Sequence, residues 1–274
     1  MTVESRRRFA DVVRADEIDL SLACLLIGVE VQPDLDVAEG LARLDQLAAE
    51  ALTTVAAEAP AYDVAVGLRT ALGDAAGFRG YGDDYGDVRS SLLHEVLRRR
   101  RGLPILLSVV YMEVGRRLGV PVCGIGLPGH FLVGVPGPDS TVLLDPFYGG
   151  RLTSEAELRA RVEDIVSSPD ELTDEWLAPW SSLDVLTRIL GNIRATSTSN
   201  DTLRTRLWAV ELSLLIPHHN ATLRRERGEL LARLGDYFGA ARELEDYAAV
   251  ISPVDPAAAE LSLRQARLVR SRLS

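Results

Sequence analysis

Two residues, His130 and Asp145, could form two of the three members of a catalytic triad, namely the base and the residue that orients it. His130 opens the apolar run His130-Phe131-Leu132-Val133-Gly134-Val135, and Asp145 closes the run Thr141-Val142-Leu143-Leu144-Asp145. Both runs have the length and composition of β-strands. An imidazole that a carboxylate orients can act as a general base and activate a hydroxyl or thiol beside it. The pair is therefore compatible with nucleophilic catalysis, provided that a nucleophile lies within reach.

The four residues Pro136-Gly137-Pro138-Asp139 predict a hairpin between these runs. If they form the whole loop, the residue numbers of any two paired positions add up to 275. Val133 then faces Val142, and His130 faces Asp145 directly. Directly opposite residues have Cβ atoms about 4.5–5.5 Å apart on one face of the sheet. The alternative to a catalytic role is a structural pair in which the imidazole donates to the carboxylate and stabilises the hairpin.

The elements before the hairpin read as helices. Leucines and alanines at helical spacing fill the first third, with a turn at Gln32-Pro33-Asp34. The glycine-rich segment 77–86 predicts an ordered loop packed by Phe78 and Tyr81. Ser90 or Ser91 is expected to cap a helix that runs to Arg100. A buried helix should then begin at Pro104 and end at Gly119.

The C-terminal third carries a weak helical repeat. Gly191 and Gly228 lie 37 residues apart, and Pro217 and Pro253 lie 36 apart. The better unit is 221–253, where small or apolar residues occupy the packing positions. This spacing resembles tetratricopeptide repeats, although Arg224 stands where their first helix has a tryptophan-type residue.

Composition excludes several classes of function. The net charge of −10 argues against nucleic acid as a partner, and all 30 basic residues are arginine, which excludes lysine-based chemistry. No run reaches the roughly 18 apolar residues of a membrane span, and two cysteines cannot make a disulfide framework, so we expect a cytoplasmic protein. The cluster Arg98 to Arg101 fits a solvated helix end, and alternatively a contact for an acidic partner.

Four motifs resemble those of the SirB-type family, bacterial proteins that join a transglutaminase-like core to tetratricopeptide-like helices. They are Gly77-Phe78-Arg79-Gly80, Gly102-Leu103-Pro104-Ile105-Leu106-Leu107-Ser108, Pro128-Gly129-His130-Phe131-Leu132 and Asp145-Pro146-Phe147-Tyr148-Gly149-Gly150. The resemblance covers roughly residues 20–255, and the same block occurs in some eukaryotic F-box proteins. It implies that His130 and Asp145 are retained triad positions and that Phe131, Phe147 and Tyr148 are motif or pocket residues.

The resemblance leaves the nucleophile in question. Active transglutaminase-like enzymes place a cysteine about fifteen residues before the glycine of Leu-Gly-Ile-Pro, and the same count back from Gly119 reaches Pro104. Proline cannot attack a carbonyl. Ser108, one helical turn later, is a candidate nucleophile, although a serine within a helix often bonds the carbonyl four residues earlier. Cys123 is the other candidate, with a small buried apolar role as its alternative.

We therefore expect an α+β fold: a helix-rich transglutaminase-like, papain-like core with a small antiparallel sheet, then an all-α repeat region. The expected domains are 1–170 and 171–274. The favoured function is a non-catalytic scaffold or regulator that binds another protein through its repeats. The alternative is a hydrolase or acyltransferase that uses Ser108 or Cys123 with His130 and Asp145. No cofactor is expected, and a metal site, whether at His218 and His219 or at His94 with His130 and Asp145, is disfavoured.

Overall fold

The computed structural model describes residues 3–163 and 177–273, which form two compact units. One unit comprises residues 17–189, and the other comprises residues 2–16 with 190–274. The expected boundary after residue 170 lies outside the described residues. The two units meet in sequence between residues 16 and 17 and within helix α8 (Ser182–Thr196).

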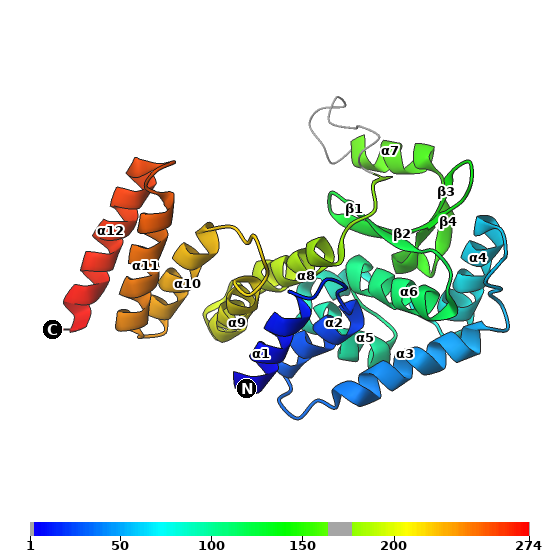
Figure 1. Ribbon diagram of the computed structural model, residues 1–274, viewed down its shortest axis with the longest axis horizontal. Helices are drawn as coiled ribbons and strands as arrows, with labels where there is room; N and C mark the ends of the chain where they lie inside the picture. The colour runs from blue at the N-terminus through cyan, green and yellow to red at the C-terminus, as the bar shows by residue number, and fades with distance from the viewer. Residues whose placement is uncertain (1–2, 164–176, 274) are drawn as a thin grey trace. The chain divides into compact units, whose positions relative to one another are not determined.

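The first unit is a helical assembly around a four-stranded antiparallel sheet in the order β1-β2-β3-β4, as the expected α+β fold requires (Figure 1). Its strands are β1 (Cys123–Leu127), β2 (His130–Pro136), β3 (Thr141–Asp145) and β4 (Arg151–Thr153). Its helices are α2 (Leu20–Val29), α3 (Val37–Ala51), α4 (Ala61–Leu68), α5 (Leu93–Arg99), α6 (Pro104–Leu118) and α7 (Glu155–Glu163), with a π-helical segment at Arg69–Ala75. Short 3-10 helices span Gly82–Gly86, Val88–Ser91 and Pro146–Tyr148.

Helix α6 begins and ends where the sequence predicts. Pro104 is its first residue, where the missing N–H costs no hydrogen bond. Gly119 ends it in the left-handed conformation at φ 71°, which a residue without a Cβ adopts most easily. All residues from Pro104 to Gly115 except Met112 are buried, which explains the apolar run in this segment.

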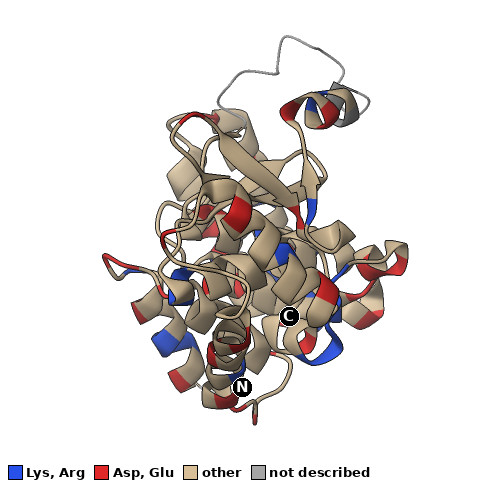
Figure 2. Ribbon diagram, turned by 90° about the vertical axis from the view of Figure 1, so that its right-hand side faces the viewer, with Lys and Arg blue, Asp and Glu red and all other residues tan. Residues whose placement is uncertain are grey.

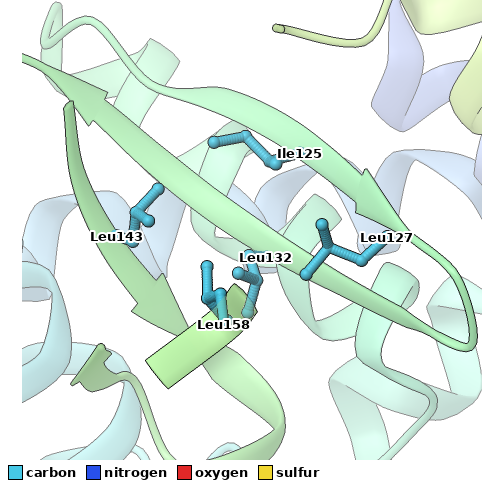
Figure 3. Close-up of a cluster of buried hydrophobic side chains, with 5 residues drawn as sticks. All are labelled: Ile125, Leu127, Leu132, Leu143 and Leu158. Carbon is cyan, nitrogen blue, oxygen red and sulfur yellow. The ribbon is translucent and has the colours of Figure 1, made fainter. Parts of the chain in front are cut away.

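The sheet is buried on both faces. One face packs on α6 and α4. On the other, Ile125, Leu127, Leu132 and Leu143 pack against Leu158 of α7 (Figure 3). The four strands are almost free of charged positions (Figure 2), and their two charged residues, Asp145 and Arg151, are register neighbours in β3 and β4. Their side chains have other partners, His130 for Asp145 and Glu157 for Arg151. A charge inside such a sheet therefore needs a specific partner.

Two expectations near α5 need correction. Neither Ser90 nor Ser91 caps this helix, which has Leu92 at its N-cap without a side-chain hydrogen bond. The reason is that the Ser90 hydroxyl donates to the buried Asp84 carboxylate at 2.7 Å. In the preceding loop Phe78 is fully buried as expected, whereas Tyr81 is 48% exposed and stacks on the guanidinium of Arg101.

The second unit is helical throughout its described residues. It comprises α1 (Val3–Val12), the end of α8, α9 (Leu203–Ser213), α10 (Thr222–Arg233), α11 (Tyr237–Ile251) and α12 (Pro256–Arg270), with 3-10 turns at Asn200–Thr202 and Ser271–Leu273. Helices α9 to α12 each pack on the next in sequence, as stacked repeats do. The predicted unit 221–253 contains α10 and α11, and Gly228 of α10 lets Leu244 of α11 approach closely. None of the helices in the described ranges has the length and apolarity needed to cross a membrane.

Candidate functional site

His130 and Asp145 meet at one end of the two central strands of the sheet. His130 Nε2 lies 2.8 Å from Asp145 Oδ2, and the two side chains are 11% and 2% exposed. His130 begins β2 and Asp145 ends β3, so the contact joins the ends of two adjacent strands. The structure therefore forms the contact that the two runs predicted.

The register of the hairpin differs from the predicted one by two residues. Val133 pairs with Leu144 and Pro136 with Thr141, so paired positions sum to 277, and the loop is Gly137 to Ser140. The prediction that His130 faces Asp145 directly is wrong, and the two residues are diagonal neighbours. A shift of two residues leaves both side chains on one face, because side chains alternate with a period of two. Diagonal neighbours lie about 7–8 Å apart, within reach of long side chains.

The backbone around Asp145 orients its carboxylate. Asp145 Oδ1 accepts a hydrogen bond from the Phe147 N–H at 3.2 Å, which caps the short helix Pro146–Tyr148. The chain then turns at Gly149 and Gly150, both in the left-handed conformation, and the Gly150 N–H donates to the Asp145 carbonyl at 2.9 Å. The Asp-Pro-Phe-Tyr-Gly-Gly motif is therefore a turn that presents one carboxylate oxygen to the imidazole.

Aromatic rings surround the imidazole. The His130 ring centroid lies 6.0 Å from that of Phe147 and 6.3 Å from that of Tyr148, and Phe147 also contacts Tyr85 at 5.7 Å. Tyr148 is 55% exposed, so this wall of the site opens to solvent. Tyr85 is a site residue that sequence reasoning missed, because its position in an irregular loop does not indicate which element it contacts.

Phe131 does not belong to this ring cluster. It is buried on β2 and packs edge-to-face on Trp180 at 5.5 Å. Adjacent residues of a strand point to opposite faces, so Phe131 lies on the other side of the sheet from His130. Of the three expected motif residues, the structure brings Phe147 and Tyr148 to His130 and places Phe131 in the core.

Neither candidate nucleophile is directed at His130. Ser108 is fully buried on α6, and its hydroxyl donates to the Phe131 carbonyl at 3.5 Å rather than to the carbonyl of Pro104. Cys123 pairs with Gly134, whereas His130 pairs with Leu127. This difference of four residues along the strands corresponds to about 13 Å. Burial also raises the pKa of the Cys123 thiol, which disfavours the reactive thiolate.

Tyr111 of α6 is a further polar group near the site. It is fully buried, and its hydroxyl has no hydrogen-bond partner among the described residues. A Cβ on Gly150 would lie 2.7 Å from this hydroxyl, so the Gly149-Gly150 turn packs directly against it. Burial and the nearby Asp74 raise the pKa of Tyr111, so the phenol stays protonated at neutral pH. Sequence reasoning missed Tyr111, because a tyrosine within the apolar run of α6 cannot be distinguished from an ordinary core side chain.

The described residues contain no cluster of three or more histidine, cysteine or acidic side chains that could hold a metal ion. His130 has Asp145 as its acidic partner, and His94 lies among α2, α3 and α5. In the second unit, His219 Nδ1 lies 3.0 Å from the Ile216 carbonyl oxygen. His94, His130 and His219 therefore have different surroundings and do not form one ligand cluster among the described residues.

Asp145→Asn should change the tautomer of His130. In the wild type the carboxylate accepts from Nε2–H, which fixes the proton on Nε2. An asparagine can present its NH2 group instead, which favours a proton on Nδ1. Long-range ¹H–¹⁵N NMR of the imidazole reads the two nitrogens separately, and Asp139→Asn in the hairpin loop is the control. Identical His130 spectra in wild type and Asp145→Asn would contradict the pairing.

Comparison with known proteins agrees with this architecture. A family model described as "Transglutaminase-like superfamily" matches residues 38–191, and one described as "Tetratricopeptide repeat" matches residues 193–274. A UPF0162 protein of Xylella fastidiosa is 38% identical over 175 residues, or 62% of each chain. A UPF0162 protein of Pseudomonas aeruginosa is 33% identical over 192 residues, or 70% of each chain.

A shorter match covers 56 residues of F-box only protein 21 of Mus musculus, with 43% identity over 20% of this chain and 9% of that protein. The chain matches 62% of the length of the Xylella fastidiosa relative. The matched models and the bacterial relatives confirm the resemblance that the four motifs carried. The chain belongs to the transglutaminase-like superfamily, with tetratricopeptide repeats after its core.

Proposed function

We propose that this protein is an interaction scaffold that binds a partner polypeptide through its repeat helices, with the transglutaminase-like core as a rigid platform that performs no acyl transfer. The observation that carries the proposal is the exposed face of α12. Leu261 and Leu268 are 61% and 68% exposed and lie seven residues apart, which puts them on one side of the helix.

The opposite side of α12 packs on α11 with small residues. Ala259, Ser262 and Ala266 are buried, and the Ser262 hydroxyl donates to the Leu244 carbonyl at 2.8 Å. Two exposed leucines on a helix whose other face is already packed form a surface that a partner helix or peptide could cover. Tetratricopeptide repeats commonly mediate protein–protein interactions.

Three features of the core support the platform role. The position that a nucleophile would occupy is Pro104, Ser108 is buried and bonded to a carbonyl, and Cys123 lies on another part of the sheet. Asp145 still orients His130, so the hairpin retains its frame. A cytoplasmic location is part of the proposal and fits the two free cysteines.

Site-specific photo-crosslinking tests the repeat surface. A photoreactive residue at Gln265, between the two leucines, should form adducts with a partner protein in cells. The double variant Leu261→Glu/Leu268→Glu should abolish the adducts and leave helicity unchanged. Leu263→Glu is the matched control, since Leu263 is 39% exposed on another side of the same helix. Adducts that survive the double variant would contradict this surface.

An activity probe tests the second part of the proposal. Serine-directed and cysteine-directed covalent reagents should leave Ser108 and Cys123 of the folded protein unmodified, by mass spectrometry. Modification after denaturation serves as the control for Cys123. Labelling of either residue in the folded protein that disappears in His130→Ala would show an active nucleophile and restore the hydrolase or acyltransferase alternative.

A further inference from the structure

A cavity of about 570 Å³ lies in the first unit, among the α2–α3 turn, α3 and α5. Its size is within the usual range of small-molecule sites, about 300–1,000 Å³. His130 and Asp145 are not part of it. The charged residues that line it are Asp36, Glu39, Arg43, Glu95, Arg98 and Arg100.

The arginine cluster at the end of α5 divides into two pairs. Arg99 and Arg101 turn toward the aspartates of the glycine-rich loop, with Arg101 Nε 3.0 Å from Asp84 Oδ1 and Arg99 Nη1 3.2 Å from Asp87 Oδ2. Arg98 and Arg100 line the cavity instead. The cluster is therefore more than a solvated helix end, because half of it holds the loop and half faces the cavity.

Arg100 has an unfavourable backbone conformation. It caps α5 in the left-handed region at φ 58° and ψ 25°, a position that glycine usually fills. Among the described residues, Arg100 and His218 are the non-glycine residues with positive φ. Strain of this kind is found at functional sites, where the side chain has a use that offsets it.

Most charged side chains of the cavity wall have partners in the protein, and one acidic and one basic side chain do not. Asp36 caps α3 through the Ala38 and Glu39 N–H groups, and Glu95 holds Arg98 at 2.7 Å. Arg43 donates to Gln46 at 2.6 Å, and its Nη1 also lies 3.8 Å from Glu50 Oε1. The side chains of Glu39 and Arg100 have no hydrogen bond or ion pair with any described residue. Both residues are exposed, so the open cavity presents one carboxylate and one guanidinium that have no partner among the described residues.

His94 adds a polar but uncharged group to the wall. Its Nδ1 packs against α2, where a Cβ on Gly28 would lie 2.3 Å away, and has no hydrogen-bond partner among the described residues. Burial lowers the pKa of His94, so the ring is neutral at pH 7. The balance of charge in the cavity is therefore set by its carboxylates and guanidinium groups.

We propose that this cavity binds a small zwitterion, a molecule the size of an amino acid or dipeptide whose carboxylate pairs with Arg100 and whose ammonium pairs with Glu39. A planar guanidinium fits a carboxylate through two parallel hydrogen bonds. The requirement for both charges distinguishes this site from one that binds simple anions. The inference does not depend on the proposed scaffold function.

Calorimetric titration of the full chain tests the proposal. Each of the twenty standard amino acids and a set of glycyl dipeptides are titrated, and then the N-acetylated and C-amidated forms of the best binder. We expect saturable binding of a zwitterion and at least tenfold weaker binding of each blocked form. No saturable binding by any zwitterion, or equal binding of the N-acetylated form, would overturn it.

Two variants separate loss of binding from loss of folding. Arg100→Gly should raise the melting temperature, because glycine suits the left-handed conformation, and yet weaken binding at least tenfold. Glu39→Gln should remove the preference for the free amine over the N-acetylated form. Arg100→Gly protein that melts higher and binds like the wild type would overturn the role of Arg100. Leu261→Glu/Leu268→Glu should bind the zwitterion normally, which keeps this test distinct from that of the repeat surface.

Discussion

Asp84→Ala is expected to lower the free energy of unfolding by about 1–3 kcal/mol, the cost of leaving a buried hydrogen-bonding group unsatisfied. Asp84 has no exposed surface and accepts from the Ser90 hydroxyl at 2.7 Å, the Tyr81 N–H at 2.8 Å and Arg101 Nε at 3.0 Å. Its removal leaves the buried Ser90 hydroxyl without its acceptor, while the part-exposed Arg101 keeps Asp83 as a partner. Urea denaturation followed by circular dichroism measures the loss.

The neighbouring residue provides the control. Asp83 also bonds Arg101, at 2.6 Å, but its side chain is 78% exposed. An exposed ion pair contributes about 0–1 kcal/mol, so Asp83→Ala should change the free energy of unfolding by less than about 1 kcal/mol. Equal losses in the two variants would show that burial of Asp84 does not determine the strength of this network.

Gly80→Ala should destabilise the protein and disturb the His130 site. A Cβ at residue 80 would lie 1.9 Å from the Phe147 ring, and the Gly80 N–H donates to the Phe147 carbonyl at 2.8 Å, so neither backbone can easily withdraw. Overpacking of this kind costs about 1–3 kcal/mol. Because Phe147 contacts His130, its displacement should also shift the His130 imidazole signals in NMR spectra.

Gly82→Ala is the matched control for this prediction. Gly82 belongs to the same loop, and a Cβ there would meet no atom within 4 Å. The free energy of unfolding of Gly82→Ala and its His130 imidazole signals in NMR spectra should match those of the wild type. If Gly80→Ala behaves like Gly82→Ala, the close approach of the Gly-Phe-Arg-Gly segment to Phe147 is not what holds the aromatic wall in place.

Local sequence predicted the elements whose ends have their own chemical signals. Pro104 and Gly119 delimit α6 because each suits its backbone position without help from the rest of the chain. Strand β3 was predicted with its correct bounds for a similar reason, since turn residues flank it. Strand β4 was missed because Arg151–Thr153 is too short to show an alternating pattern and is a strand only through its pairing with β3.

Sequence by itself determined that His130 and Asp145 share a face of one hairpin, since side-chain alternation has a period of two and any even shift of register preserves it. The resemblance to transglutaminase-like proteins also predicted that Pro104 stands at the nucleophile position. Only the tertiary structure decided the register itself, the hydrogen bond of Ser108 to Phe131, the distance of Cys123 from His130 and the division of the arginine cluster between Asp84 and the cavity. These features depend on contacts between segments far apart in the chain, and no local pattern records which segments will meet.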